Sequence, residues 1–127
     1  MIDRSQIKIL LVDDEPTIRD SLDEFLGDCG FAVSSCESGE DALDQIRQES
    51  HSVAIIDMRL PGMTGDELIL RAHQLQPSLK FLILTGSIDF QISEDLKKVG
   101  VQSGHILKKP LPNLFHLVKV VESLTQE

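Results

Sequence analysis

The 127-residue chain has no tryptophan or tyrosine, only two cysteines, and far fewer basic than acidic residues. With 12 basic and 21 acidic residues its net charge is −9, and a surface of that sign repels the phosphate backbone of nucleic acids. Direct nucleic-acid binding by this chain is therefore not expected. Cys29 and Cys36 lack a C-x-x-C spacing, which favours two reduced packing residues over a disulfide or a metal pair.

Long hydrophobic runs are missing as well. No apolar segment approaches the length of a membrane span, and residues 1–7 are too short and too polar for a signal peptide. We therefore expect a cytoplasmic protein that does not contact a membrane. Hydrophobic residues (41%) and charged residues (26%) are in ordinary globular proportion, so we expect a single domain over residues 1–127, with an ordered core over about residues 6–124.

Short apolar runs alternate along the chain with helical patterns. Each run is too short for a helix and suits a strand of a parallel sheet, and the weakly alternating run 31–36 is the expected edge strand. The predicted strands cover residues 7–12, 31–36, 53–56, 80–84 and 105–107. Helical spacing predicts helices that start at Pro16, Ser38 and Asp66, and two more over residues 88–99 and 114–124. This alternation predicts an α/β fold, with helices on both faces of one doubly wound parallel sheet.

Polar side chains follow four of the five predicted strands. They are Asp13 and Asp14 after the first strand, Asp57 after the third, Thr85 after the fourth, and Lys108 and Lys109 after the fifth. In open parallel sheets the carboxyl ends of the strands border the ligand crevice, so we expect these side chains to converge. Carboxylates that converge repel one another, and Mg²⁺ is the cation best suited to compensate them. Such a set suits phosphoryl transfer, with an aspartate as the nucleophile.

Four segments together resemble the receiver domain of two-component response regulators over essentially the full length of the chain. They are LLVDDEP (residues 10–16), IIDMRLPGMTG (55–65), LILTG (82–86) and KKP (108–110), in this order and at these spacings. The resemblance implies a single-domain, flavodoxin-like (βα)5 fold with strand order 2-1-3-4-5.

The resemblance also implies a role for each acidic residue. Asp57 would be the phosphoacceptor, which receives a phosphoryl group from the phosphohistidine of a sensor histidine kinase or a phosphotransfer protein. Asp14 would bind Mg²⁺ directly and Asp13 through water, with the Asp57 carboxylate and the backbone carbonyl of Arg59 as further ligands. The phosphorylated aspartate would then switch an output surface, so the chain would catalyse only its own phosphorylation and dephosphorylation.

The remaining implied roles fall on the last two strands. Thr85 would hydrogen-bond to the phosphoryl group, and Lys109 would pair with it across a cis Lys109-Pro110 peptide. Lys109 is preferred to Lys108 because it directly precedes the proline. The family usually has an aromatic residue three positions before this lysine, where this chain has Ile106, which argues against an aromatic-gated switch.

The fourth helix, fifth strand and fifth helix form the expected output face for a downstream effector. The segment between Gly100 and Lys109 is about two residues longer than the family pattern, and it lies on this face. Arg59 and Ser87, next to the expected phosphoryl site, are candidates for tuning dephosphorylation by admitting or blocking a water.

Other interpretations are weighed against this one. Asp13 and Asp14 could instead cap the first helix. The domain could also be a receiver-like binding module that no longer phosphorylates, although its complete set of acids, threonine and lysine argues against that. A third possibility is a Mg²⁺-dependent phosphohydrolase, but that chemistry needs an Asp two residues after the nucleophile, where Arg59 stands.

Overall fold

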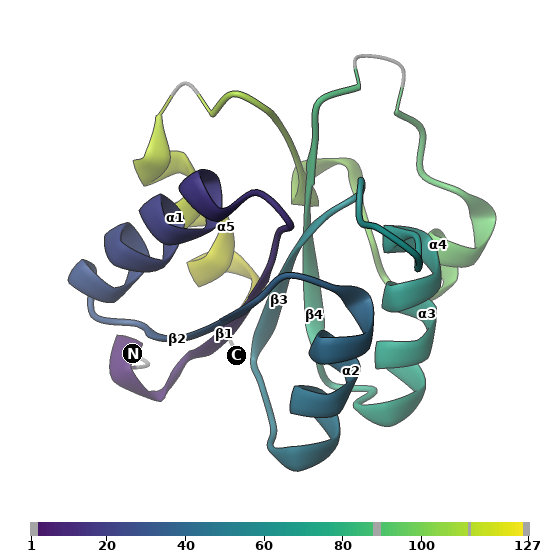
Figure 1. Cartoon of the computed structure of the whole chain (residues 1–127), viewed down its shortest axis with the longest axis horizontal. Helices are drawn as coiled ribbons and strands as arrows, with labels where there is room; N and C mark the ends of the chain where they lie inside the picture. The colour runs from purple at the N-terminus through teal and green to yellow at the C-terminus, as the bar shows by residue number, and fades with distance from the viewer. Residues whose placement is uncertain (1–2, 88–89, 112, 126–127) are drawn as a thin grey trace.

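A computed structural model describes residues 3–87, 90–111 and 113–125, and among them five parallel strands form one sheet (Figure 1). Their order is β2-β1-β3-β4-β5, which confirms the predicted 2-1-3-4-5 topology with the weakly alternating strand at one edge. The strands are β1 (Lys8–Val12), β2 (Ala32–Cys36), β3 (Val53–Asp57), β4 (Lys80–Thr85) and β5 (Ile106–Lys108).

Helices cover both faces of this sheet (Figure 1). The helices α1 (Pro16–Asp28) and α5 (Leu114–Leu124) pack on one face, and α2 (Gly39–Gln48), α3 (Gly65–Leu75) and α4 (Glu94–Lys98) lie over the other. Successive side chains along each strand point to opposite faces of the sheet and so contribute to two separate hydrophobic cores. Leu10 and Ile56 belong to the core beneath α2 and α3, whereas Leu11 and Ile55 belong to the core beneath α1 and α5. The central strands are buried on both faces, as their unbroken apolar runs predict.

Polar side chains mark where the helices begin. Ser38 accepts a hydrogen bond from the Asp41 N–H, which confirms the predicted start of α2, and Thr64 caps α3 in the same way by accepting from the Glu67 N–H. After α1 the chain turns at Gly30, whose φ of 101° lies in the left-handed region that favours glycine. Because all four strand pairings are parallel, the carboxyl ends of the strands lie at one edge of the sheet.

The predicted helix over residues 88–99 is wrong in its extent. The observed helix α4 begins only after Ser93, whose side chain accepts from the Leu96 N–H, and residues 88–89 lie outside the described part of the chain. Phe90 and Ile92 precede the helix and pack against the α2/α3 core from a non-helical segment. Apolar residues that suggest a helix here are therefore held by tertiary packing instead.

The fifth strand is displaced by one residue from the prediction. His105 ends a 3₁₀ turn (Ser103–His105) rather than beginning the strand, which runs over Ile106–Lys108. In the described part of the chain, no helix combines the length and apolar character needed to cross a membrane. Cys29 and Cys36 are both free thiols, as expected.

Candidate metal and phosphoryl site

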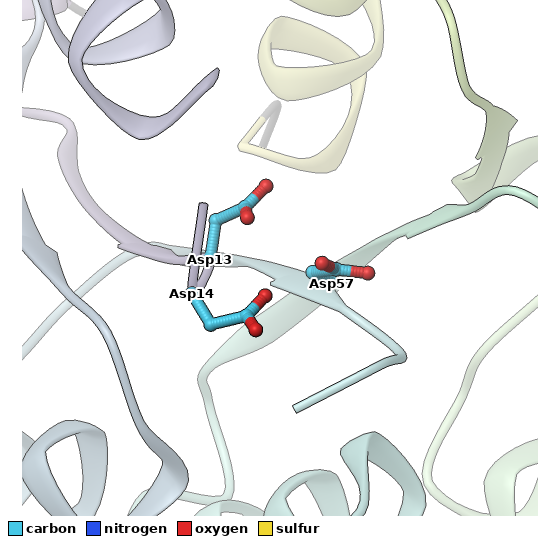
Figure 2. A group of neighbouring side chains, drawn as sticks. All are labelled: Asp13, Asp14 and Asp57. Atoms are coloured by element: carbon cyan, nitrogen blue, oxygen red, sulfur yellow. The ribbon is translucent and has the colours of Figure 1, made fainter. Parts of the chain in front are cut away.

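Three carboxylates converge at the carboxyl edge of the sheet. Asp13 and Asp14 directly follow β1, and Asp57 is the last residue of the neighbouring β3. One oxygen from each of the three lies within 4.8 Å of the others, and Figure 2 shows the three side chains gathered at the ends of the two strands. The predicted convergence of the three acidic residues is therefore found in the structure.

The three acidic residues differ in exposure. Asp13 is completely buried (0%) and Asp57 nearly so (4%), whereas Asp14 is open to solvent. Two buried carboxylates at short range repel each other, and that repulsion must be balanced by a cation. Of the three acidic side chains, that of Asp14 is therefore the one open to solvent.

Lys109 supplies part of that balance. Its Nζ lies 3.0 Å from Asp13 Oδ2 and 3.1 Å from Asp57 Oδ2, so a single ammonium bridges both buried acids. Burial opposes the charged ammonium, but the hydrogen bonds and charges of Asp13 and Asp57 outweigh it and raise the pKa of Lys109. Lys108, the alternative site lysine, is exposed and pairs with Thr85 in the β4–β5 register.

The backbone around Lys109 fixes its approach. The Lys109 N–H donates to the Thr85 carbonyl at 2.8 Å, which extends the β4–β5 pairing by one residue. The Lys109-Pro110 peptide is cis, in agreement with the expectation. The lysine therefore enters the site from the end of an edge strand.

Backbone amides hold the carboxylates in place. The Arg59 N–H donates to Asp57 Oδ1 at 3.1 Å, and the Glu15 N–H donates to Asp13 Oδ1 at 2.9 Å. The Arg59 side chain is exposed, and its N–H is the group seen in contact with Asp57. Its carbonyl as a metal ligand stays a prediction.

Thr85 lies at the end of β4, beside the strand that carries Asp57. Asp57 is level with Leu84 in the β3–β4 register, so Thr85 is one residue beyond it. The Thr85 side chain is buried, and its Oγ1 accepts from the Ser87 N–H at 3.1 Å. Because the oxygen acts as an acceptor in this bond, its hydrogen can still be donated to a phosphoryl oxygen.

The helix-cap interpretation of the acidic pair is wrong. The N-cap of α1 is Glu15, which makes no side-chain capping bond, and Pro16 follows as the first helical residue. Asp13 accepts from Glu15 itself, ahead of the helix. The two aspartates are thus free to serve the site at the end of the strand.

Sequence reasoning missed one residue of this region, Arg19. Its Nη1 donates to the backbone carbonyl of Asp13 at 2.8 Å from the first turn of α1. No motif singled it out, because only the folded turn brings the guanidinium within reach of the Asp13 carbonyl. The donor set itself, three carboxylates without histidine or thiolate, suits a hard cation such as Mg²⁺ or Ca²⁺.

Comparison with known proteins identifies the family. A family model described as the response regulator receiver domain matches residues 9–122. The chain belongs to this family. Receiver domains are phosphoacceptor signalling domains that bind Mg²⁺ and interact with histidine kinases and effector domains.

Individual relatives and structures agree with this assignment. The chain is 32% identical over 125 residues to the uncharacterized transcriptional regulatory protein YesN of Bacillus subtilis, which covers 94% of the chain but 33% of that longer protein. The receiver domain structure from Methanospirillum hungatei, described as CheY-like, has 31% identity and a TM-score of 0.81, and covers 93% of each chain.

A third comparison bears on the chemistry. A response regulator from Burkholderia pseudomallei, whose structure holds a phosphorylated aspartic acid, a calcium ion and citrate, has 25% identity and a TM-score of 0.79. The match covers 91% of this receiver domain and 66% of that chain. A phosphorylated aspartate therefore occurs in a related protein of the same fold.

Proposed function

We propose that this receiver domain accepts a phosphoryl group on Asp57 from the phosphohistidine of a sensor histidine kinase or a phosphotransfer protein. A carboxylate oxygen of Asp57 forms a bond to phosphorus while the bond between phosphorus and the histidine nitrogen breaks, and that nitrogen takes up a proton from solvent. The observation that best supports this is the single ammonium of Lys109, at 3.0 and 3.1 Å from the two buried acids. It leaves the cluster with uncompensated negative charge that a divalent cation would balance.

The residues that would hold Mg²⁺ are Asp13, Asp14, Asp57 and the backbone carbonyl of Arg59. When bound, the cation would neutralise charge on the transferring phosphoryl oxygens, which is the main requirement of this chemistry. The protein's own part is to fix the Asp57 carboxylate: the Arg59 N–H holds one oxygen and Lys109 contacts the other. The nucleophile is therefore oriented before any donor arrives.

We infer that the added charge, about −1.5 to −2, is received by Thr85 and Lys109. Lys109 would exchange its present carboxylate partners for a phosphoryl oxygen, and the Thr85 hydroxyl would donate its hydrogen to another. Both residues adjoin the face formed by α4, β5 and α5, which we propose as the output surface for an effector. Half-buried Ile106 lies on that face in place of an aromatic residue, so movement of Thr85 itself would have to carry the switch.

We place the protein in the cytoplasm. We also propose that Arg59 and Ser87, which adjoin the site, set the rate at which the domain dephosphorylates itself. The Arg59 N–H contacts Asp57 and the Ser87 N–H contacts Thr85, so both residues adjoin a residue that would hold the phosphoryl group. Arg59→Ala and Ser87→Ala are expected to change the lifetime of the aspartyl-phosphate, because each alters water access to phosphorus. An unchanged lifetime in both variants would refute this role.

The experiment is incubation with Mg²⁺ and a small phosphodonor such as acetyl phosphate. Intact-mass spectrometry should show one added phosphoryl group on the wild type and none on Asp57→Asn. Absence of any adduct would favour the binding-module interpretation, and continuous turnover of varied phosphoesters would favour the phosphohydrolase. Arg59 argues against the hydrolase, because a guanidinium stays protonated and cannot act as a general acid near neutral pH.

A further inference from the structure

Arg19 occupies an unusual position in the most acidic part of the protein. Residues 13–49 contain 12 acidic and two basic residues, Arg19 and Arg47. Half-buried Arg19 borders a cleft of about 520 Å³ between α1, the end of β2 and α2, whose other charged lining residues are Asp20, Glu37, Asp41 and Asp44. Yet none of the ion pairs found among the described residues involves Arg19. Its guanidinium instead donates to the backbone carbonyl of Asp13.

That hydrogen bond is one of several that fix the backbone and the carboxylate of Asp13. The Asp13 N–H donates to the Cys36 carbonyl at 3.2 Å, and its Oδ1 accepts from the Glu15 N–H. Its Oδ2 accepts from Lys109 Nζ, and its carbonyl oxygen accepts from Arg19 Nη1 at 2.8 Å. In the contact from Arg19, a charged side chain donates to a backbone carbonyl. Hydrogen bonds with a charged donor are stronger than those between two neutral groups.

The carbonyl that Arg19 holds belongs to the peptide unit joining Asp13 to Asp14. Because a peptide unit is planar, fixing its oxygen also fixes the direction in which the chain leaves Asp13 and enters Asp14. We propose that Arg19 is a positioning residue, which sets the relative orientation of these two carboxylates for the divalent cation. This inference rests on the proposed metal site and names a residue that controls it.

The sign of the effect separates positioning from simple charge. Arg19 is a cation close to a cation site, so by Coulomb repulsion alone its removal would strengthen Mg²⁺ binding. Loss of an outer partner that orients metal ligands has the opposite effect and typically weakens metal affinity by about 10–100-fold. Weaker binding after charge removal would therefore identify the positioning role.

The first experiment is isothermal titration calorimetry with Mg²⁺ on Arg19→Gln, with Arg19→Met as the second variant should the first not fold. Either variant is expected to raise the Mg²⁺ Kd by about tenfold. Arg47→Gln is the matched control: exposed Arg47 bonds Asp44, which lines the same cleft, and its loss removes the same charge. The control is expected to change the Kd by less than about twofold. Unchanged or tighter binding in a folded Arg19 variant would overturn the proposal.

A second measurement needs no metal. The Glu15 amide is protected by Asp13 Oδ1, so loosening the Asp13 backbone should speed its hydrogen exchange in chelator without affecting β3. Unchanged Glu15 exchange in Arg19→Gln would count against the proposal as well. If the wild type bound no Mg²⁺, the proposed metal site would be refuted. Equal binding by the wild type and the variant would refute only the proposed role of Arg19.

Discussion

Replacing Lys109 with methionine should destabilise the metal-free protein far more than replacing its neighbour Lys108. Methionine keeps much of the aliphatic stem and removes the ammonium that bridges Asp13 and Asp57. The two carboxylates are then left buried and without a cation. Lys108→Met removes the same charge from an exposed side chain, so it is the matched control.

The expected size follows from burial and distance. Unit charges 3.0 Å apart attract by about 5.5 kcal/mol at an effective dielectric of about 20. Breaking a buried pair by removing one partner costs about 3–5 kcal/mol. Because the Lys109 side chain is 17% exposed while that of Asp13 is 0% exposed, we take the lower end, about 3 kcal/mol, or a fall in Tm of about 10 °C.

The assay is urea and thermal unfolding in chelator, followed by far-UV circular dichroism because the chain lacks the tryptophan and tyrosine used for fluorescence. The pKa of Lys109 is raised in the folded state, so its contribution is complete below the unfolded value of about 10.4 and is lost only as the pH rises through the folded one. Near neutral pH the full effect should therefore be seen.

A double substitution tests the stated cause. Adding Asp13→Asn to Lys109→Met removes one of the two uncompensated charges, so it should restore part of the lost stability. The reasoning would be refuted if Lys109→Met and Lys108→Met were equally stable, or if Asp13→Asn lowered stability by the same amount with and without the lysine.

Two other predictions concern the stability of the fold. Burial, opposed by the charge of Glu49, lowers the pKa of His51, so the free energy of unfolding should fall as the pH drops below the unfolded value of about 6.5, by up to about 1.4 kcal/mol per pH unit. Urea unfolding at several pH values should show this slope, and a His51→Met variant with the same slope would exclude this origin. Gly65→Ala would place a Cβ 2.5 Å from Met58 Sδ and 3.0 Å from its Cα, so thermal unfolding should show a loss of about 1–3 kcal/mol. Gly104→Ala, where nothing lies within 4 Å, should cost little, and equal costs would contradict the packing argument.

The parts of the fold that the sequence predicts well are those in which local pattern and tertiary role coincide. The run Val53–Asp57 is apolar because β3 is buried on both faces, and it ends on a carboxylate because the strand ends at the site. The position of Pro110 likewise predicts which of the two lysines belongs to the site. Lys109, which directly precedes this proline, is the one that contacts Asp57. A pattern that has only one structural explanation can be interpreted without coordinates.

The parts that could not be predicted depend on contacts made only in the folded chain. Phe90 and Ile92 have the apolar character of a helix face, yet they pack against the core before α4 begins at the Ser93 cap. Arg19 looks like an ordinary polar residue on the surface of α1, and only the turn after β1 brings the Asp13 carbonyl within its reach. The spacing of residue types along the sequence does not reveal a hydrogen bond from a side chain to the backbone of another segment.

The most direct test of the central claim is to locate the phosphorylated residue. After incubation with Mg²⁺ and acetyl phosphate, borohydride reduction of the acyl-phosphate followed by peptide mass spectrometry identifies the modified side chain. The account predicts modification at Asp57, dependent on Mg²⁺ and abolished by chelator. Modification at another residue, or equal modification of Asp57 in chelator, would contradict it.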